Sequence, residues 1–102
     1  MSNVEYVVDL VLWPSDRRFR CPGSGCRSFL YRFETAESML GAHAVTADGH
    51  DLAPGTEHQG AVLAPWAEIA QVFEVAVGDR FIIWYGGDVG EGIVTAVRSS
   101  DR

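Results

Sequence analysis

Two cysteines and three histidines are the residues of this chain with the most versatile chemistry. Cys21 and Cys26 enclose Pro-Gly-Ser-Gly, and His43, His50 and His58 lie in one later stretch. The cysteine spacing allows a disulfide or half of a zinc site, and a Cys2His2 site can be drawn with the histidines. A zinc site usually takes four ligands, however, and a second closely spaced ligand pair is missing. We therefore expect free thiols in a turn, no metal and no other cofactor.

No stretch of the chain matches a catalytic motif. Ser24 lies between two glycines, but a serine nucleophile needs a strand-to-helix elbow, and no helix is expected after it. Nothing in the sequence brings a cysteine and a histidine together as nucleophile and base. The glycine-rich run 86–92 lacks the lysine and the Ser/Thr with which a phosphate-binding loop holds phosphates and magnesium. We therefore expect neither enzymatic activity nor GTP binding.

The basic residues are all arginines, and they are unevenly distributed. Five of them, Arg17, Arg18, Arg20, Arg27 and Arg32, occur in a stretch without acids, whereas residues 33–79 hold eight acids and no base. The net charge of -6 argues against general nucleic-acid binding, and against DNA as a partner, because phosphate neutralisation requires many bases. The cluster still offers one phosphate or acidic partner a local arginine surface; the alternative is a solvated loop without a partner.

The alternation of apolar and polar residues between turn signals predicts a series of short strands. The expected strands are 4–13, 27–34, 39–47, 59–64, 71–77, 80–85 and 90–97. A short helix over 35–40 competes with the third strand, and one helical turn is expected at 66–70. The expected reversals are Asp48-Gly49, Pro54-Gly55, Gly78-Asp79 and Gly86-Gly87-Asp88. Short strands separated by glycine turns favour a closed barrel, which has no exposed strand edges.

We expect one all-β domain over residues 1–102, a single closed antiparallel six-stranded β-barrel. Most of the large aromatic residues should lie in its interior, namely most of Trp13, Phe29, Trp66, Phe73, Phe81, Trp84 and Tyr85. Trp84 and Tyr85 are neighbours in one strand and point to opposite faces, so one of them is a candidate for a partner contact or for burial under a loop. No basic region precedes a long apolar run, and no apolar stretch is long enough to cross a bilayer. We therefore expect a cytoplasmic protein without a membrane partner.

The last third of the chain resembles a hairpin of a known family. Residues 80–94 read Arg-Phe-Ile-Ile-Trp-Tyr-Gly-Gly-Asp-Val-Gly-Glu-Gly-Ile-Val, which is similar to the closing hairpin of the C-terminal barrel of the translation elongation factor Tu family. In that family an Arg-Phe strand runs into a Gly-Gly turn and then into Val-Gly-x-Gly-x-Val. Residues 25–31 and 52–55 resemble that family's Gly-Tyr-Arg-Pro-Gln-Phe and Met-Pro-Gly segments, in the same order. The resemblance covers nearly the whole chain.

In that family the barrel helps to bind the T-stem of aminoacyl-tRNA and contacts a GTPase domain and a nucleotide exchange factor. The resemblance places Arg27 at the family's arginine, and Tyr85 and Gly86 where a Glu-Gly pair approaches the tRNA backbone. With the arginine cluster, it implies a non-catalytic binding module that docks a protein or a tRNA-like RNA. The expected partner-binding residues are Arg17, Arg18, Arg20, Arg27, Tyr85 and Gly86.

Two alternatives belong to other classes of protein. One is a small-molecule binder or enzyme that uses His43, His50 or His58 at the mouth of the barrel. The other is a structural or oligomerisation module that mimics an elongation factor barrel.

Overall fold

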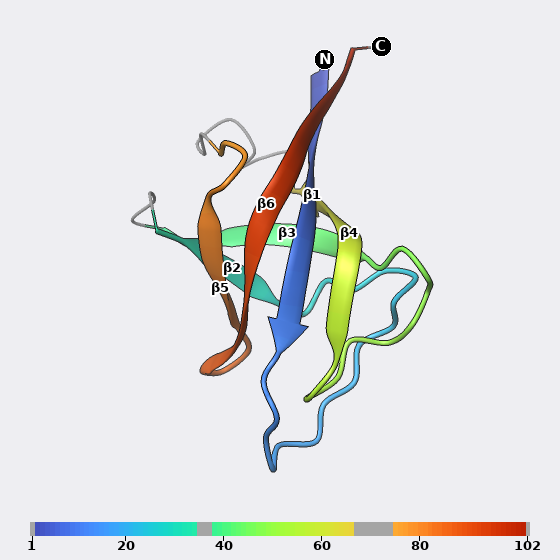
Figure 1. Ribbon diagram of the computed structural model, residues 1–102, viewed down its shortest axis with the longest axis vertical. Coiled ribbons are helices and arrows are strands. Elements are labelled where there is room, and N and C mark those ends of the chain that lie inside the picture. The colour runs from blue at the N-terminus through green and yellow to red at the C-terminus, as the bar shows by residue number, and fades with distance from the viewer. Residues whose placement is uncertain (1, 35–37, 67–74, 102) are drawn as a thin grey trace.

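The chain forms a closed barrel of antiparallel strands, and the computed structural model describes residues 2–34, 38–66 and 75–101 (Figure 1). The strands are β1 (Ser2–Leu12), β2 (Leu30–Phe33), β3 (Leu40–Val45), β4 (Glu57–Pro65), β5 (Arg80–Trp84) and β6 (Asp88–Asp101). Their order around the barrel is β1-β4-β3-β2-β5-β6, and the pairing of β6 with β1 closes it. The prediction of an all-β, closed, antiparallel six-stranded β-barrel is therefore confirmed.

The pairing of β1 with β6 is the longest in the barrel. It runs from Ser2 opposite Asp101 to Leu12 opposite Gly90. One end of this pair extends beyond the rest of the barrel and carries both chain ends side by side (Figure 1). On its other side β1 pairs with β4. Because β1 has a partner along both edges, it presents no open strand edge within the barrel.

The barrel interior is built from residues that alternate along the strands. On β1 the buried residues are Tyr6, Val8, Leu10 and Leu12, and the residues between them are half-buried. Between the paired strands β2 and β5, the rings of Phe33 and Phe81 lie 5.1 Å apart between centroids, and those of Tyr31 and Phe81 lie 5.7 Å apart. Each such aromatic pair contributes about 0.5–1.5 kcal/mol beyond its area burial. The period of two read from the sequence therefore corresponds to one buried and one outward face.

The aromatic residues predicted to fill the interior do so only in part. Phe29 and Phe81 are buried, and their expected role is confirmed. The expectation that most of these rings are interior is wrong, because Trp13, Trp84 and Tyr85 are half-buried and Trp66 is 38% exposed. The indole of Trp66 instead lies against Gly41 on the outside of β3, where a methyl group on the glycine would collide with it. Phe73 lies outside the described residues. The interior is filled instead by smaller rings, among them Tyr31 and Phe33.

Two strand predictions differ from the structure. The strand expected from residue 27 begins only at Leu30, because residues 13–29 form a long loop that touches the sheet through single bridges. The strand expected over 71–77 is wrong for its described part, since Val75–Val77 leads into a turn in which the Ala76 N–H donates to the Asp79 carboxylate over 2.9 Å. Residues 71–74, and most of the helical turn expected at 66–70, lie outside the described residues. Residues 35–37 of the competing helix also lie outside them, whereas residues 38–40 are described and are not helical, and Leu40 belongs to β3.

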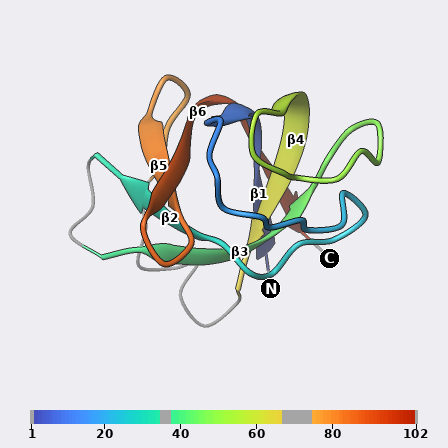
Figure 2. The ribbon, with the colours of Figure 1, turned by 90° about the horizontal axis from the view of Figure 1, so that it is seen from below.

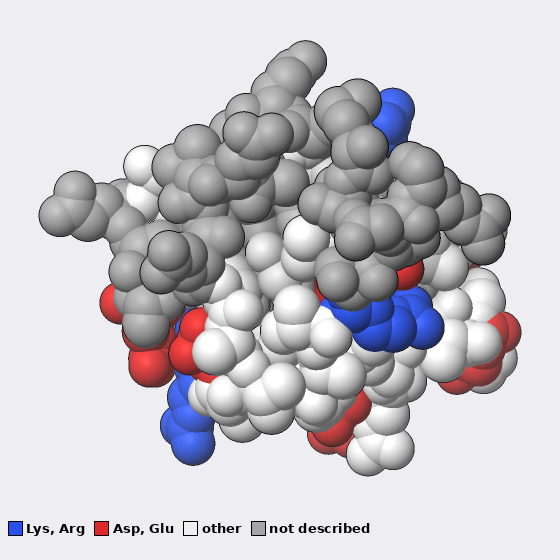
Figure 3. Space-filling model, turned by 90° about the horizontal axis from the view of Figure 1, so that it is seen from above, with Lys and Arg blue, Asp and Glu red and all other residues white. Residues whose placement is uncertain are grey.

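The loop of residues 13–29 and the β5–β6 hairpin turn lie at the end of the barrel away from the chain ends (Figures 1 and 2). At the opposite end, the visible acidic and arginine side chains are interspersed and form no field of one sign (Figure 3). Within the described ranges, no helix is long and apolar enough to span a membrane. The partner-binding residues predicted from the sequence belong to the loop of residues 13–29 and to the β5–β6 hairpin turn.

Candidate functional site

Arg17, in the loop after β1, stacks on Tyr85, which directly follows β5. The carbon of its guanidinium group lies 5.3 Å from the centroid of the Tyr85 ring. A cation over an aromatic face at this distance is attracted by the ring quadrupole, with about 0.5–1 kcal/mol at an exposed position. The side chain of Arg17 is exposed and Tyr85 is half-buried. Two residues predicted from distant parts of the sequence therefore meet in the fold.

The ring of Tyr85 is also packed from the protein side. Its centroid lies 5.4 Å from that of Phe19 and 5.6 Å from that of Phe29, and the two phenylalanines are 5.8 Å apart. Phe29 is buried and Phe19 is half-buried. An aromatic residue beside the hairpin was expected either to contact a partner or to be covered by a loop. The Tyr85 ring is partly covered by the loop that carries Phe19 and Phe29. Sequence reasoning missed Phe19, because nothing in a polar loop indicates which ring it will meet.

Gly86 completes this arrangement at the tip of the hairpin. Its φ of +68° is a left-handed conformation that glycine adopts without strain. A Cβ atom built on Gly86 would lie 3.3 Å from Nη2 of Arg17, so the guanidinium group sits close to the hairpin backbone. The Tyr85 N–H donates to the Gly87 carbonyl over 2.8 Å and closes the turn. We call Arg17, Arg18, Tyr85 and Gly86 the loop–hairpin surface.

The other predicted arginines are not gathered at one point. Arg20 forms an ion pair with Asp51 at 3.3 Å, so its charge is partly neutralised. Arg32 forms a two-pronged pair with Asp88, with N–O distances of 3.1 and 3.2 Å. Arg18 and Arg27 are exposed and form no ion pair within the described residues. Only Arg17 is in contact with the hairpin residues that the sequence predicted.

The prediction of free thiols is wrong, because Cys21 and Cys26 are joined by a disulfide. Each cysteine is anchored to the barrel by backbone hydrogen bonds, Cys21 to Leu52 and Cys26 to Ala44. These two bridges fold the intervening Pro-Gly-Ser-Gly into a turn and bring the sulfur atoms together. A disulfide leaves no thiolate to bind zinc or act as a nucleophile. It is also typical of oxidising compartments, so the cytoplasmic location stays a prediction without support from the cysteines.

The three histidines are separated in the fold. His50 is exposed and pairs with Asp48 at 3.2 Å. His43 belongs to β3, and its ring lies against Gly25 of the disulfide loop. His58 is buried, with its Nε2 2.9 Å from the Thr56 hydroxyl. No described pocket contains more than one of them, and the described residues include no group of three His, Cys, Asp or Glu that could hold a metal ion.

The pKa of His58 is lowered, mainly because burial disfavours the imidazolium, and the nearby charge of His50 acts in the same direction. Asp48 acts against this lowering. The Thr56 hydroxyl lies 2.7 Å from the Ala53 carbonyl and donates to it, so its oxygen is left to accept a hydrogen bond from Nε2–H of His58. This contact holds the neutral ring in place. The buried His58 thus has a packing contact through Thr56 in this position.

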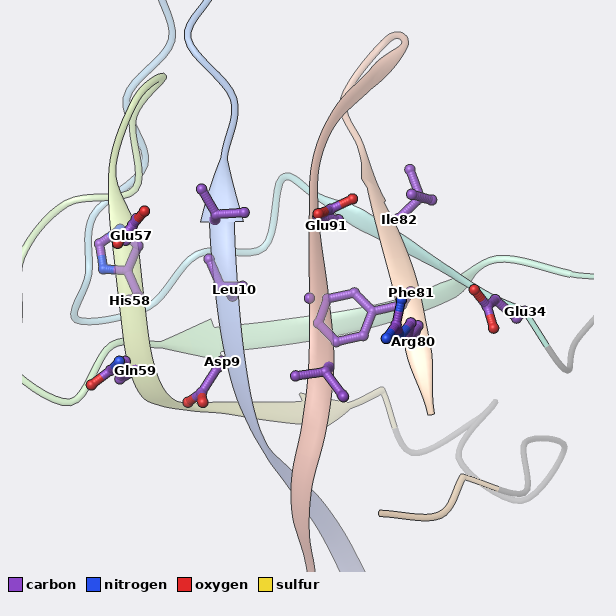
Figure 4. A pocket seen from close by; sticks show the side chains of 13 residues that line it. Asp9, Leu10, Glu34, Glu57, His58, Gln59, Arg80, Phe81, Ile82 and Glu91 are labelled. Carbon is purple, nitrogen blue, oxygen red and sulfur yellow. The ribbon is translucent and has the colours of Figure 1, made fainter. Parts of the chain in front are cut away.

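A hollow of about 470 Å³ lies on the outer face of β4, β1, β6 and β5 (Figure 4). Four acids line it, Asp9, Glu34, Glu57 and Glu91, together with Arg80 and the buried His58. Three half-buried apolar residues, Val11, Ile82 and Ile93, lie among them. We call this hollow the acidic groove.

Sequence reasoning missed the acidic groove. The sequence held a signal for it, because acids alternate with valine or isoleucine at the outward positions of β1 and β6, as in Asp9 and Val11 or Glu91 and Ile93. The alignment of these residues could not be predicted, because it depends on how strands far apart in the sequence pair. In the fold, Val11 lies opposite Glu57 of β4 on one side and Glu91 of β6 on the other. Residues far apart in the chain therefore form one surface.

Comparison with protein-family models and with curated proteins finds no match to this chain.

Proposed function

We propose that this chain is a non-catalytic binding module that docks an acidic segment of a protein partner through the loop–hairpin surface. The observation that carries the proposal is the stacking of Arg17 on Tyr85 beside Gly86. The resemblance of residues 80–94 to the hairpin of the elongation factor Tu barrel supports it, since that barrel contacts protein partners as well as tRNA. We also propose that the barrel is related to the C-terminal barrel of that family.

The stacked arginine is suited to hold a carboxylate. An arginine side chain normally loses rotamer freedom when it binds, but the ring of Tyr85 already restricts Arg17. Its planar guanidinium group presents several N–H donors in a fixed geometry that matches a carboxylate. Arg18, its neighbour, is exposed without an acidic partner among the described residues and adds a second positive charge.

A protein is favoured over RNA by the charges and by the covered ring. A net charge of -6 opposes the approach of a polyanion, and among the described residues Arg20, Arg32 and Arg98 are already paired with acids. Arg17 lies over the Tyr85 ring and Phe19 packs against it, so less of the ring is open to a stacking base. A short acidic peptide needs neither a long basic track nor an aromatic platform.

Titration of the full chain with a labelled glutamate-rich peptide tests the proposal. Arg17→Ala and Arg18→Ala should each weaken binding by roughly threefold, the scale of a partly exposed ion pair. Arg98→Ala removes the same charge from β6, where Arg98 pairs with Glu5, and should leave binding unchanged. Equal affinity in all four proteins would refute docking at the loop–hairpin surface.

A parallel titration with tRNA at two salt concentrations separates the RNA alternative. Phosphate binding weakens steeply with salt, and each lost phosphate contact lowers the salt slope by about one. Salt-sensitive tRNA binding that Arg17→Ala reduces, without peptide binding, would replace the protein partner with RNA. No binding of either probe would leave the loop–hairpin surface without a function.

A further inference from the structure

We infer that the acidic groove binds a short basic segment of a partner protein, one that carries an apolar side chain between two arginines or lysines. This surface lies on the side of the barrel, whereas the loop–hairpin surface lies at its end. The two surfaces share none of their residues, so the inference does not depend on the proposed function.

The strand register places two carboxylates on either side of an apolar residue. Val11 lies opposite Glu57 of β4 and opposite Glu91 of β6, so the three form a row across adjacent strands. Neighbouring strands are about 4.8 Å apart, which puts the backbones of the two glutamates about 10 Å apart. Ile82 continues the row, because it lies opposite Glu91 on β5. Acid and apolar positions thus alternate along the groove.

The carboxylates of the groove are not used by the barrel itself, with one exception. Asp9 accepts the Gly60 N–H over 3.0 Å at a β-bulge, which gives it a structural role. Glu34, Glu57 and Glu91 are exposed and form no ion pair with the described residues. Their charges are therefore available to an incoming cation. Arg80 is the one arginine in the lining, which also includes the buried His58, and a single guanidinium group cannot neutralise all the carboxylates.

The chemistry of the groove selects its occupant. Carboxylates on a concave surface raise the local concentration of basic groups, and the half-buried Val11, Ile82 and Ile93 lose contact with water when an apolar side chain covers them. A bare metal ion does not fit, since no three carboxylates of the described residues are close enough together to hold one. An arginine- or lysine-bearing peptide with an apolar residue satisfies both features.

The test is a titration with a labelled peptide that contains arginine and leucine, at low and at moderate salt. The double variant Glu57→Gln/Glu91→Gln should bind roughly ninefold more weakly than the wild type, about threefold for each of two partly exposed ion pairs. Ile82→Thr should also weaken binding, although it changes no charge. Binding should fall as salt rises. A matched peptide with glutamate in place of arginine should not bind to the groove.

A charge-matched control decides whether the groove or the overall charge is responsible. Glu5→Gln/Asp16→Gln removes two acids elsewhere and should leave peptide binding within about twofold of the wild type. Equal weakening in both double variants, or none in either, would overturn the inference. Melting curves confirm that each variant is folded. Sedimentation of the chain alone gives a further outcome, because a dimer that Glu57→Gln/Glu91→Gln dissociates would mean that a second copy covers the groove and that the inference is wrong.

Discussion

The guanidinium group of Arg17 lies over the ring of Tyr85 and joins the loop after β1 to the hairpin that closes the barrel. The contact is made from the outside, while Phe19 and Phe29 hold the same ring from within. It therefore couples the position of an exposed charge to the packed part of the fold. Several measurable consequences follow from this and from other contacts of the barrel.

Replacement of Arg17 by alanine should lower the free energy of unfolding by about 0.5–1 kcal/mol, because the cation is lost from the ring face. Arg18→Ala is the matched control and should change it by less than about 0.5 kcal/mol. In a Tyr85→Leu background, Arg17→Ala should have no effect on stability, since the ring is gone. Urea denaturation of the wild type, Arg17→Ala, Tyr85→Leu and the double variant measures the coupling between the two side chains. An equal effect of Arg17→Ala in both backgrounds would show that the stacking contributes nothing.

Gly86→Ala should cost about 1–2 kcal/mol of stability, because an L-residue is strained at a φ of +68°. Gly49→Ala, at a φ of +78° with open space around it, should cost a similar amount. The two variants should differ in peptide binding at the loop–hairpin surface, since only a methyl group at position 86 meets Arg17. Identical peptide affinities for the two variants would mean that the hairpin backbone takes no part in docking.

Tyr31→Phe should stabilise the protein by about 1 kcal/mol. The Tyr31 hydroxyl is buried and finds no hydrogen-bond partner among the described residues, and burial raises its pKa. An unsatisfied buried hydroxyl costs more than the methine that replaces it. Tyr6→Phe is the control, because the Tyr6 hydroxyl is not among the buried polar groups that lack a hydrogen-bond partner. Thermal unfolding monitored by circular dichroism would contradict the expectation if Tyr31→Phe melted at or below the wild-type temperature.

Stability should fall as the pH drops below about 6.5. The pKa of His58 in the folded protein is lowered from its ordinary value of 6.5 by burial. The unfolded chain therefore binds a proton at a pH where the folded protein does not, and the stabilising contribution present above 6.5 is lost as the pH falls toward the folded pKa. His58→Gln should flatten this part of the profile. Chemical denaturation between pH 7 and 5 checks the slope, and an unchanged slope in His58→Gln would assign it to other groups.

Loss of the disulfide should destabilise the fold by about 2 kcal/mol, the amount expected for a crosslink that closes a very short loop. Cys21→Ser/Cys26→Ser should show this loss directly. A thiol reductant should lower the melting temperature of the wild type toward that of the double variant and leave the variant itself unaffected. A wild-type melting temperature that does not respond to complete reduction would mean that the backbone bridges to Leu52 and Ala44 hold the loop unaided.

Much of the fold could be predicted from the sequence, because strands and tight turns are local. The alternation along β1 and the Gly86-Gly87 turn depend on neighbouring residues, so they could be recognised without any partner in view. The same locality explains the errors. Val75–Val77 has the composition of a strand, yet the hydrogen bonds with Asp79 make it the start of a turn. The tryptophans are large and apolar, but the interior of this narrow barrel takes rings of smaller size.

By itself the sequence determined the class of fold and an arginine-rich segment near a glycine hairpin. Only the tertiary structure decided which of these residues meet: Arg17 reaches Tyr85, whereas Arg20 is taken up by Asp51. It also decided the acidic groove, since Glu57 and Glu91 become neighbours of Val11 only through the pairing of three strands. The physical reason is that side-chain periodicity is set by the backbone of each strand, while register between distant strands is set by closure and packing of the whole barrel.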